Sequence, residues 1–394
     1  GKEIIFGNDV DIEDVIWTGP LPLLKDKIKN FGITSSEPFS GFETYIKEAA
    51  GRNRKIHYLP PYNPNTKISL SKLLGIEIDQ LKENASMELM LAVINLRSLK
   101  SAEEVAEIEK GIETAYEMFT KGMKLVKPGK YEYEVAGAME GIALAKNGVL
   151  SFPIILSVRG EILHGHAHGN LMNEGDMLVM DSGFETPDHY ATDHTRTVPV
   201  NGKFTQKQNE IYQIVLDSQM AAIDAIKPGV KYQDVHLLSC KVIAEGLKQL
   251  GLMKGDTDEA VKQGAHALFF PHGLGHMMGL DVHDMEDIGQ IYVGYDAEVR
   301  PIDQFGTAYL RLGRRLQPGF VLTVEPGIYF IPELYTLWKS ENKFTEFINY
   351  DKVAEYLGFG GIRIEDDVLV TETGHRVLGR SIPKTVEEIE ALMA

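Results

Sequence analysis

The chain carries an internal repeat, and this repeat restricts the folds open to it more than any other feature. The segment KPGKYEYEV at 127–135 returns one hundred residues later as KPGVKYQDV at 227–235. Each copy follows a helical pattern and precedes a second one, which stops near Gly148 in one copy and Gly251 in the other. The repeat therefore predicts two similar halves, each with a pair of helices.

The duplication extends to two predicted strands. GDMLVMD at 175–181 is matched by GFVLTVE at 319–325, and each apolar run places a carboxylate six residues after a glycine. Chance recurrence of Pro-Gly turns is the alternative interpretation. The pattern favours an α+β domain with pseudo-two-fold symmetry, and it places a functional site at the junction, where each half contributes side chains.

The character of the sequence changes near residue 98. Before it, short segments such as EIIFG and MELMLAVINL resemble strands, separated by the turn-rich PPYNPNT. Ser101 and Glu104 then match a capping box at the start of a long amphipathic helix. We expect a smaller α/β domain over 1–98, which looks incomplete, and a catalytic domain over 99–394.

Composition excludes two classes of partner. The chain has 40 Lys and Arg against 57 Asp and Glu, a formal charge of −17, which opposes attraction to nucleic acid or anionic membranes. The single cysteine, Cys240, lies in a helical pattern, where we expect it to pack in the core. It forms no intrachain disulfide, which suits a reducing compartment, so we expect a cytoplasmic protein without membrane spans.

Four acids stand next to apolar strands, where isolated charges are costly. Asp181 and Asp193 are expected on neighbouring strands of a hairpin, while Glu325 and Glu365 each end an apolar run. Burial of several carboxylates needs a compensating cation. Four acids with one imidazole, His276, suit a pair of divalent ions such as Mn²⁺, Co²⁺ or Zn²⁺. Such a pair activates a hydroxide, which makes amide hydrolysis the natural reaction. A purely structural metal site would favour a closed Cys/His set instead.

The glycine- and histidine-rich segment 271–284 has two other interpretations, and both fail. Its glycines are spaced one residue too widely for a dinucleotide loop, and no apolar strand leads into them. His272 and His276 have the spacing of a zinc-binding helix, but Gly273 replaces the Glu that such a helix requires.

Five separated motifs resemble the signatures of metallopeptidases with the pita-bread fold, over roughly residues 100–394: MDSG, YATDHTRT, HGLGHMMGLDVHD, LTVEPGIY and GIRIEDDVLVT. The sequence is most similar to the prolidases, or Xaa-Pro dipeptidases, and the related Xaa-Pro aminopeptidases. The resemblance implies a homodimer and two metal ions, Mn²⁺ first. One ion would be bound by Asp181, Asp193 and Glu365, and the other by Asp193, His276, Glu325 and Glu365.

The resemblance also implies roles for the residues around the metals. Glu325 would shuttle a proton, and Arg363 would hold the bridging acids in place. His164 matches a family residue near the scissile bond, and His283 matches one that supports the transition state. His272 and Tyr329 would line the proline pocket. His166 and His168, which alternate with His164 along an apparent strand, are interpreted as exposed neighbours.

An extended loop over 286–316 bears on substrate length. Arg311 falls where prolidases carry an arginine that pairs with the free carboxylate of a C-terminal proline, which favours a proline-containing dipeptide as substrate. An aminopeptidase acting on longer peptides is the alternative. A third hypothesis from another class is a pita-bread module that binds peptides or proteins without catalysis.

Overall fold

The computed structural model describes residues 2–394, which fall into two compact units, one ending at Ala92 and the other spanning Val93–Ala394. In the first unit β1 pairs in parallel with β2. Its elements are β1 (Ile5–Gly7), α1 (Ile12–Thr18), α2 (Leu24–Lys27), η1 (Ile28–Phe31), β2 (Ser36–Pro38), η2 (Phe39–Gly41), α3 (Phe42–Gly51), α4 (Pro64–Leu74) and η3 (Ile78–Gln80). The features that bear on function lie in the second unit.

One predicted strand is wrong. MELMLAVINL forms most of helix α5 (Met87–Ser98), whereas EIIFG contains β1 as expected. Ser86 begins the helix, because its hydroxyl accepts a hydrogen bond from the backbone N–H of Leu89 at 3.4 Å. Met, Leu, Glu and Ala, which fill much of the segment, are strong helix formers, so propensity outweighs the strand-like apolar run.

The repeat appears in the structure as two helix pairs. The first pair is α6 (Ala102–Leu125) with α7 (Glu132–Ala145), and the second is α8 (Gln206–Ala225) with α9 (Tyr232–Gln249). The predicted Ser101–Glu104 capping box is present at the start of α6. The turns between the helices match as well, because Gly129 and Gly229 adopt left-handed φ values of 86° and 84°, which favour glycine.

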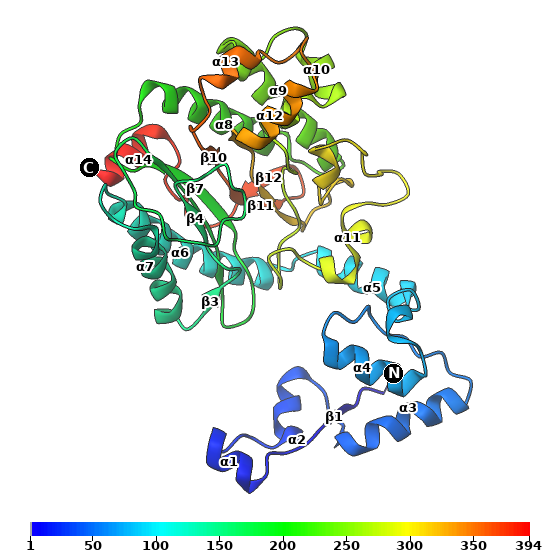
Figure 1. The fold of residues 1–394 in the computed structure, drawn as a ribbon. Helices are drawn as coiled ribbons and strands as arrows, with labels where there is room; N and C mark the ends of the chain where they lie inside the picture. Colours follow the sequence, from blue (N-terminus) through cyan, green and yellow to red (C-terminus); the bar gives the residue numbers. More distant parts are fainter. Residues whose placement is uncertain (1) are drawn as a thin grey trace. The chain divides into compact units, whose positions relative to one another are not determined.

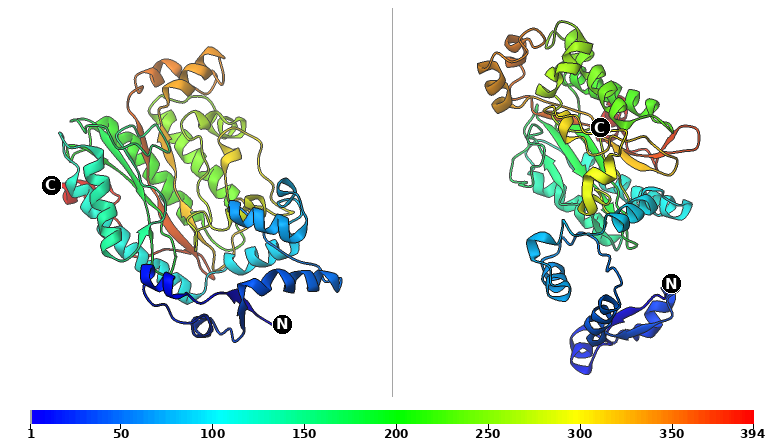
Figure 2. Two further views of the ribbon diagram at one scale, coloured as in Figure 1. Left: turned by 60° about the horizontal axis from the view of Figure 1, so that its bottom comes forward. Right: turned by 90° about the vertical axis from the view of Figure 1, so that its right-hand side faces the viewer.

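The strands of the second unit lie between these helix pairs (Figures 1 and 2). One antiparallel sheet has the order β4-β5-β7 and the other β12-β11-β8, so the two predicted acid-bearing strands are β5 and β8. Two short antiparallel pairs, β3 with β6 and β9 with β10, complete the set. The bounds are β3 (Val149–Leu150), β4 (Ile155–Ser157), β5 (Met177–Ser182), β6 (Phe184–Glu185), β7 (His194–Pro199), β8 (Val321–Val324), β9 (Gly327–Tyr329), β10 (Gly361–Arg363), β11 (Asp366–Val370) and β12 (His375–Val377).

The two halves share one core and meet between β7 and the β10–β11 segment. The backbone N–H of Glu365 donates to the carbonyl of Thr195 at 3.0 Å, and the Thr197 hydroxyl donates to the carbonyl of Arg363 at 3.0 Å. Ile108 and Ile112 of α6, in the first half, pack in one buried cluster with Val321 of β8, in the second. This junction brings side chains from both halves to one place.

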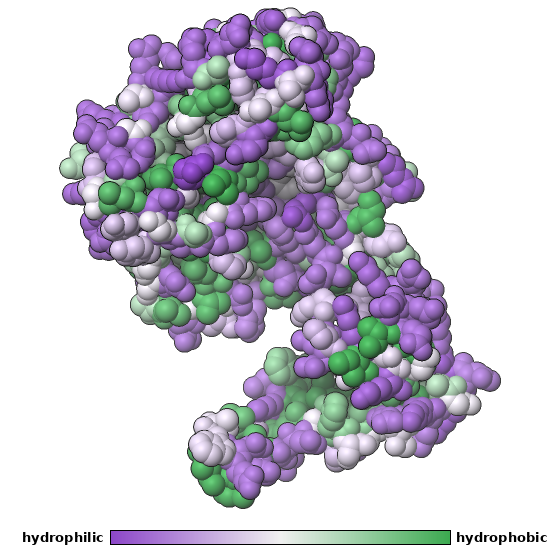
Figure 3. All heavy atoms as spheres, in the orientation of Figure 1, coloured by the Kyte–Doolittle hydropathy of each residue, from purple (hydrophilic) through white to green (hydrophobic). Residues whose placement is uncertain are grey.

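The remaining elements lie in the second half. The segment expected to be a loop over 286–316 begins with a helix, α11, which is kinked at Gly289. The bounds are α10 (Thr257–Gln263), η4 (Ala265–Leu268), α11 (Glu286–Gly294), η5 (Thr307–Tyr309), α12 (Pro332–Ser340), α13 (Tyr350–Ala354) and α14 (Val386–Met393). Among residues 2–394 no helix is both long and apolar enough to cross a bilayer. Hydrophilic residues dominate the face shown in Figure 3.

Candidate metal centre

The strand registers bring the four predicted acids together. Asp181 of β5 lies opposite Thr195 of β7, and Asp193 precedes Thr195 by two residues, so both acids point to the same face of the sheet. In the other half Asp366 pairs with Val324, which puts the residues beside this pair, Glu365 and Glu325, at one end of the ladder. Each half therefore supplies two carboxylates at the junction.

His276 lies among these acids. Its Nε2 is 3.4 Å from Asp193 Oδ2 and 3.9 Å from Glu325 Oε1. One ligand atom each from Asp193, His276 and Glu365 lies within 4.8 Å of the others. The Nδ1 of His276 lies 3.0 Å from the backbone carbonyl of Met277, which leaves Nε2 to face the carboxylates.

Within residues 2–394, three of the four carboxylates, Asp193, Glu325 and Glu365, have no Lys or Arg partner to offset their burial, and Asp181 alone is paired, with Arg363. Burial, followed by the charge of Asp181, raises the pKa of Asp193 well above its usual range. Burial and then Asp193 do the same to the pKa of Glu365, while burial raises the pKa of Glu325 to about 7. Among residues 2–394 the buried oxygens Asp181 Oδ1 and Asp193 Oδ1 have no hydrogen-bond partner. Oxygen and imidazole donors in this excess of negative charge fit divalent cations.

Arg363 holds one edge of the cluster in position. Its guanidinium pairs with Asp181, and its Nη1 donates to the Tyr329 hydroxyl at 2.8 Å. Its Nε lies 3.2 Å from the hydroxyl of Thr195, which itself donates to Glu365 Oε2 at 2.7 Å. The orientation of two of the acids is therefore set by hydrogen bonds outside any metal.

The carboxylate cluster opens into a cavity of about 650 Å³. His164, His272, His283 and Arg311, all expected near the substrate, line this cavity. The rest of the wall is largely apolar, with Phe152, Pro153, Leu163, Val282, Phe305 and Tyr309. Tyr329 is placed differently from the expectation that it lines a pocket: it is 0% exposed and lies behind His272, whose Nε2 is 2.9 Å from its hydroxyl oxygen.

Sequence reasoning missed Glu286. Its carboxylate pairs with the Arg311 guanidinium, and its Oε2 lies 3.5 Å from His283 Nδ1. Glu286 thus joins two predicted substrate residues at the cavity rim. The sequence offered no regular spacing for this contact, because His283 lies in a turn before α11, and Met285 between the two residues has a left-handed φ of 67°.

The other histidines near the motifs have separate environments. Residues 164–168 form a loop rather than the expected strand, and His166 lines the cavity with His164. His168 instead lies with Nδ1 3.0 Å from the carbonyl of Leu156. His189 Nδ1 lies 2.7 Å from Glu185 Oε1, and His194 is buried.

Known metallopeptidases are similar in sequence to this chain. The model of metallopeptidase family M24 matches residues 106–372. The chain belongs to this family. Human Xaa-Pro dipeptidase is 39% identical over 311 residues, which are 77% of this chain and 61% of that protein. A probable Xaa-Pro aminopeptidase of Sordaria macrospora is 33% identical over 398 residues, 100% of this chain and 81% of the relative.

Solved structures of M24 peptidases confirm the predicted pita-bread fold. The aminopeptidase PepP of Pseudomonas aeruginosa superposes with a TM-score of 0.78 and 28% identity, covering 99% of this chain and 82% of that one. A zinc-substituted Escherichia coli aminopeptidase P in complex with product gives a TM-score of 0.78 at 31% identity, with the same coverage. The chain spans only 61% of the length of the dipeptidases that it matches.

Proposed function

We propose that the chain is a dinuclear-metal peptidase that hydrolyses the peptide bond before proline. The observation that carries the proposal is the convergence of four acids and His276 on one open cavity, with too few internal counterions. The alternative of a binding module without catalysis is disfavoured, because a module that had lost catalysis would not need this full set of ligands.

The five residues divide between two ions in the proposed enzyme. Asp181, Asp193 and Glu365 would hold one, and Asp193, His276, Glu325 and Glu365 the other. Two such ions supply a hydroxide near neutral pH and polarise the scissile carbonyl. Mn²⁺ is the first choice for these hard ligands, with Co²⁺ and Zn²⁺ as alternatives.

The chain's own groups would then handle protons and position the substrate. Glu325 lies at the cavity with a pKa raised to about 7, which suits a carboxylate that takes a proton and returns it. Burial lowers the pKa of His283, so this side chain is neutral near pH 7 and can hydrogen-bond to the reacting carbonyl. His164 would orient the substrate from the opposite wall.

The apolar wall accounts for a proline ring next to the scissile bond. Phe152, Phe305 and Tyr309 offer flat apolar surface, and a proline lacks the N–H that would be left unpaired there. His272 borders the same wall and is held by Tyr329, which here acts as a positioning residue.

Substrate length is proposed to depend on Arg311. Its guanidinium has five N–H donors, and among the residues that the structure describes only Nη1 is engaged, by Glu286, so the remaining donors are free for a terminal carboxylate. A dipeptide would gain this interaction, which favours an Xaa-Pro dipeptidase. An Xaa-Pro aminopeptidase is the second candidate, favoured by relatives of that name that match 100% of this chain.

The experiment compares Gly-Pro with Gly-Pro-Ala in the presence of Mn²⁺. We expect the dipeptide to be preferred, and Arg311→Met to lower its kcat/KM by about 10–100-fold, the value of a charged hydrogen bond, with little change for the tripeptide. Arg315→Met is the matched control, because Arg315 belongs to the same segment but pairs with Glu298. Better cleavage of Gly-Pro-Ala would establish the aminopeptidase, and cleavage of neither would refute the proposal.

We also propose, from the family resemblance, that the chain forms a homodimer. Sedimentation of the full chain tests this directly, because a dimer has twice the mass of the 43.9 kDa protomer. A monomer at all concentrations would exclude it.

A further inference from the structure

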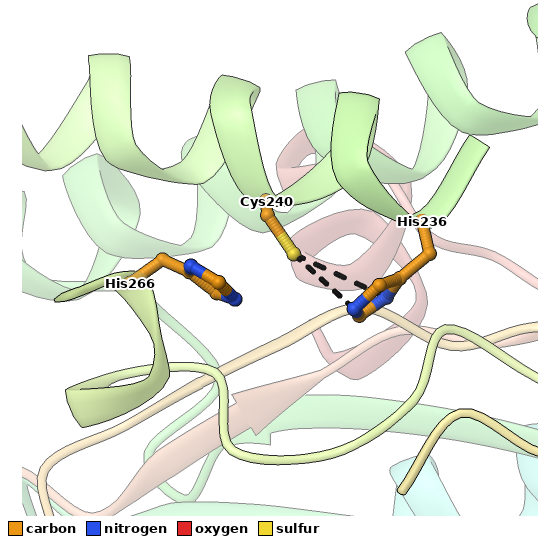
Figure 4. Close-up of side chains that lie close together, drawn as sticks. All are labelled: His236, Cys240 and His266. Carbon is orange, nitrogen blue, oxygen red and sulfur yellow. Dashed lines mark hydrogen bonds between the residues drawn. The ribbon is translucent and has the colours of Figure 1, made fainter. Parts of the chain in front are cut away.

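A second group of metal-ligating side chains lies outside the carboxylate cluster. His236 and Cys240 are one helical turn apart on α9, so they share a face, and His266 lies on the short helix η4 that packs against α9. One ligand atom from each lies within 4.8 Å of the other two. Figure 4 shows the His266 ring directed toward the Cys240 sulfur, with His236 on its other side.

All three side chains are withdrawn from solvent. His236, Cys240 and His266 are each 0% exposed. A polar group in such a place is normally hydrogen-bonded, because an unpaired buried donor or acceptor is costly. The thiol and His236 approach each other, with Sγ 3.6 Å from Nε2. Neither ring nitrogen of His266 has a hydrogen-bond partner of normal geometry within residues 2–394, although the backbone of Val261 lies near enough to oppose the effect of burial on the pKa of this histidine.

Core packing explains only part of this arrangement. A weak S–H···N hydrogen bond accounts for Cys240 and His236, and phenylalanine would fill the place of His266 without unpaired nitrogens. Burial lowers the pKa of His266 to about 4 and that of His236 to about 3. Both imidazoles are therefore neutral, the form that binds metal ions.

We propose that His236, Cys240 and His266 form a second metal site, distinct from the carboxylate centre, which takes Zn²⁺ or a similarly thiophilic divalent ion. One sulfur and two imidazoles are borderline-soft ligands, in contrast to the oxygen-rich set of Asp181, Asp193, Glu325 and Glu365. Binding replaces the S–H bond by a metal–sulfur bond and releases one proton to solvent. The two sites therefore select different metals.

The distances suit this ion. With Zn–S of about 2.3 Å and Zn–N of about 2.1 Å, a tetrahedral site separates its sulfur and nitrogen atoms by about 3.6 Å. The observed distance between Cys240 Sγ and His236 Nε2 is 3.6 Å. The remaining separations are at most 4.8 Å, so His266 would have to move inward by no more than about 1 Å, within the reach of a χ rotation.

The site also adjoins the proposed catalytic cavity. The ring of Phe270 lies between the two, with its centroid 5.6 Å from that of His236 and 4.8 Å from that of His272. An ion bound to Cys240 would hold α9 and η4 in fixed positions beside the Phe270 ring. We expect it to support the wall that carries His272, in addition to stabilising the fold by binding only the native state.

The single cysteine makes the test specific. Co²⁺ is added to the full chain, and the near-ultraviolet absorption is measured for thiolate-to-metal charge transfer. The carboxylate centre has no sulfur ligand, so such a band reports only Cys240. We expect a band that saturates at one Co²⁺ per chain, in addition to the Co²⁺ bound by the carboxylate centre, and that is displaced by Zn²⁺.

Three variants complete the experiment. Cys240→Val should abolish the band, and His266→Phe should weaken Co²⁺ binding at this site by at least tenfold. Val235→Ala is the matched control, because Val235 is a buried residue of the same helix with no ligand atom, and it should leave the band unchanged. Absence of the band in the unmodified chain would overturn the proposal whatever the variants do, and so would its persistence in Cys240→Val. Neither result would affect the proposed peptidase, which depends on the other centre.

Discussion

Glu365 and Asp366 are consecutive buried acids with opposite electrostatic environments. Asp366 Oδ1 lies 2.6 Å from Arg196 Nη2, and its Oδ2 lies 2.7 Å from Lys384 Nζ. Burial alone would raise the pKa of Asp366, but Arg196 and Lys384 outweigh it and hold the pKa well below its usual range. Glu365 accepts a hydrogen bond from the Thr195 hydroxyl, and burial, followed by the charges of the neighbouring carboxylates, raises its pKa well above the usual range.

The difference separates a structural ion cluster from a binding site. Because strand residues alternate between faces, Asp366 turns to the side where the chain supplies its own cations. Glu365 turns to the side where four acids share one guanidinium, that of Arg363, and two imidazoles, those of His276 and His272. The first cluster is complete within the described chain, whereas the second is incomplete without an external cation.

The largest effect is expected from Glu365→Gln. Loss of a bridging ligand should lower peptidase activity by at least about a thousandfold, which corresponds to about 4 kcal/mol of transition-state stabilisation. The same change should raise the urea midpoint of the metal-free chain, because it removes repulsion with Asp193 and Glu325. Full activity of Glu365→Gln, or a metal-free variant less stable than the metal-free unmodified chain, would contradict the proposed difference between Glu365 and Asp366.

Asp366→Asn should act in the opposite way on stability. It leaves the buried Arg196 and the half-buried Lys384 without their counterion, and loss of the partner of a buried charge typically costs about 3–5 kcal/mol. The loss should be the same with and without metal. Urea unfolding measures this loss of stability. Asp351→Asn is the control, because the side chain of Asp351 is 99% exposed. A loss below about 1 kcal/mol would mean that the cluster contributes little.

A smaller effect is expected from Thr195→Val, which removes the only side-chain hydrogen bond that Glu365 accepts within the described chain. Groups that orient metal ligands typically change affinity by about 10–100-fold, and we expect the lower value, because the backbone contact to Thr195 remains. Mn²⁺ titration measures the change. Thr114→Val, a similar substitution at a buried site on α6, should leave the affinity unaltered.

The two clusters also predict opposite pH dependences. The pKa of Asp366 in the folded chain lies below its ordinary 3.8, so its stabilisation is complete above that pH and is lost as the pH falls. The pKa of Glu325 is raised from 4.5 to about 7, so ionising it costs stability as the pH rises through that window. We expect the urea midpoint of the metal-free chain to be highest between these windows. Added Mn²⁺ should restore stability at neutral pH, and a flat profile would contradict this.

The metal-binding side of this contrast could be predicted from the sequence, because it depends on local pattern, whereas the pairing of Asp366 with Arg196 and Lys384 was not predicted. The repeated Pro-Gly turns and the glycine-to-acid spacing of β5 and β8 located Asp181 and Glu325 in equivalent places. The motifs supplied Asp193, His276 and Glu365, which the structure brings together.

Contacts between distant segments were not predictable in this way. The pairing of Glu286 with Arg311 and the position of Tyr329 behind His272 depend on the packing of segments that no repeat or spacing connects. Cys240 was expected only to pack in the core, and its grouping with His236 and His266 was not predicted, since two of the three lie on one helix and the third follows 26 residues after Cys240. The strand predicted for MELMLAVINL was wrong because a short apolar run does not distinguish strand from helix.

The most direct test of the central claim is the number of Mn²⁺ ions that the chain binds after a chelator has removed its metal. Electron paramagnetic resonance of Mn²⁺ in a titration of the full chain should give two ions per protomer, with return of peptidase activity as they bind. Glu365→Gln should bind fewer, and Asp366→Asn should still bind two. Full turnover by the metal-free chain, or a stoichiometry that Glu365→Gln leaves unchanged, would contradict the account.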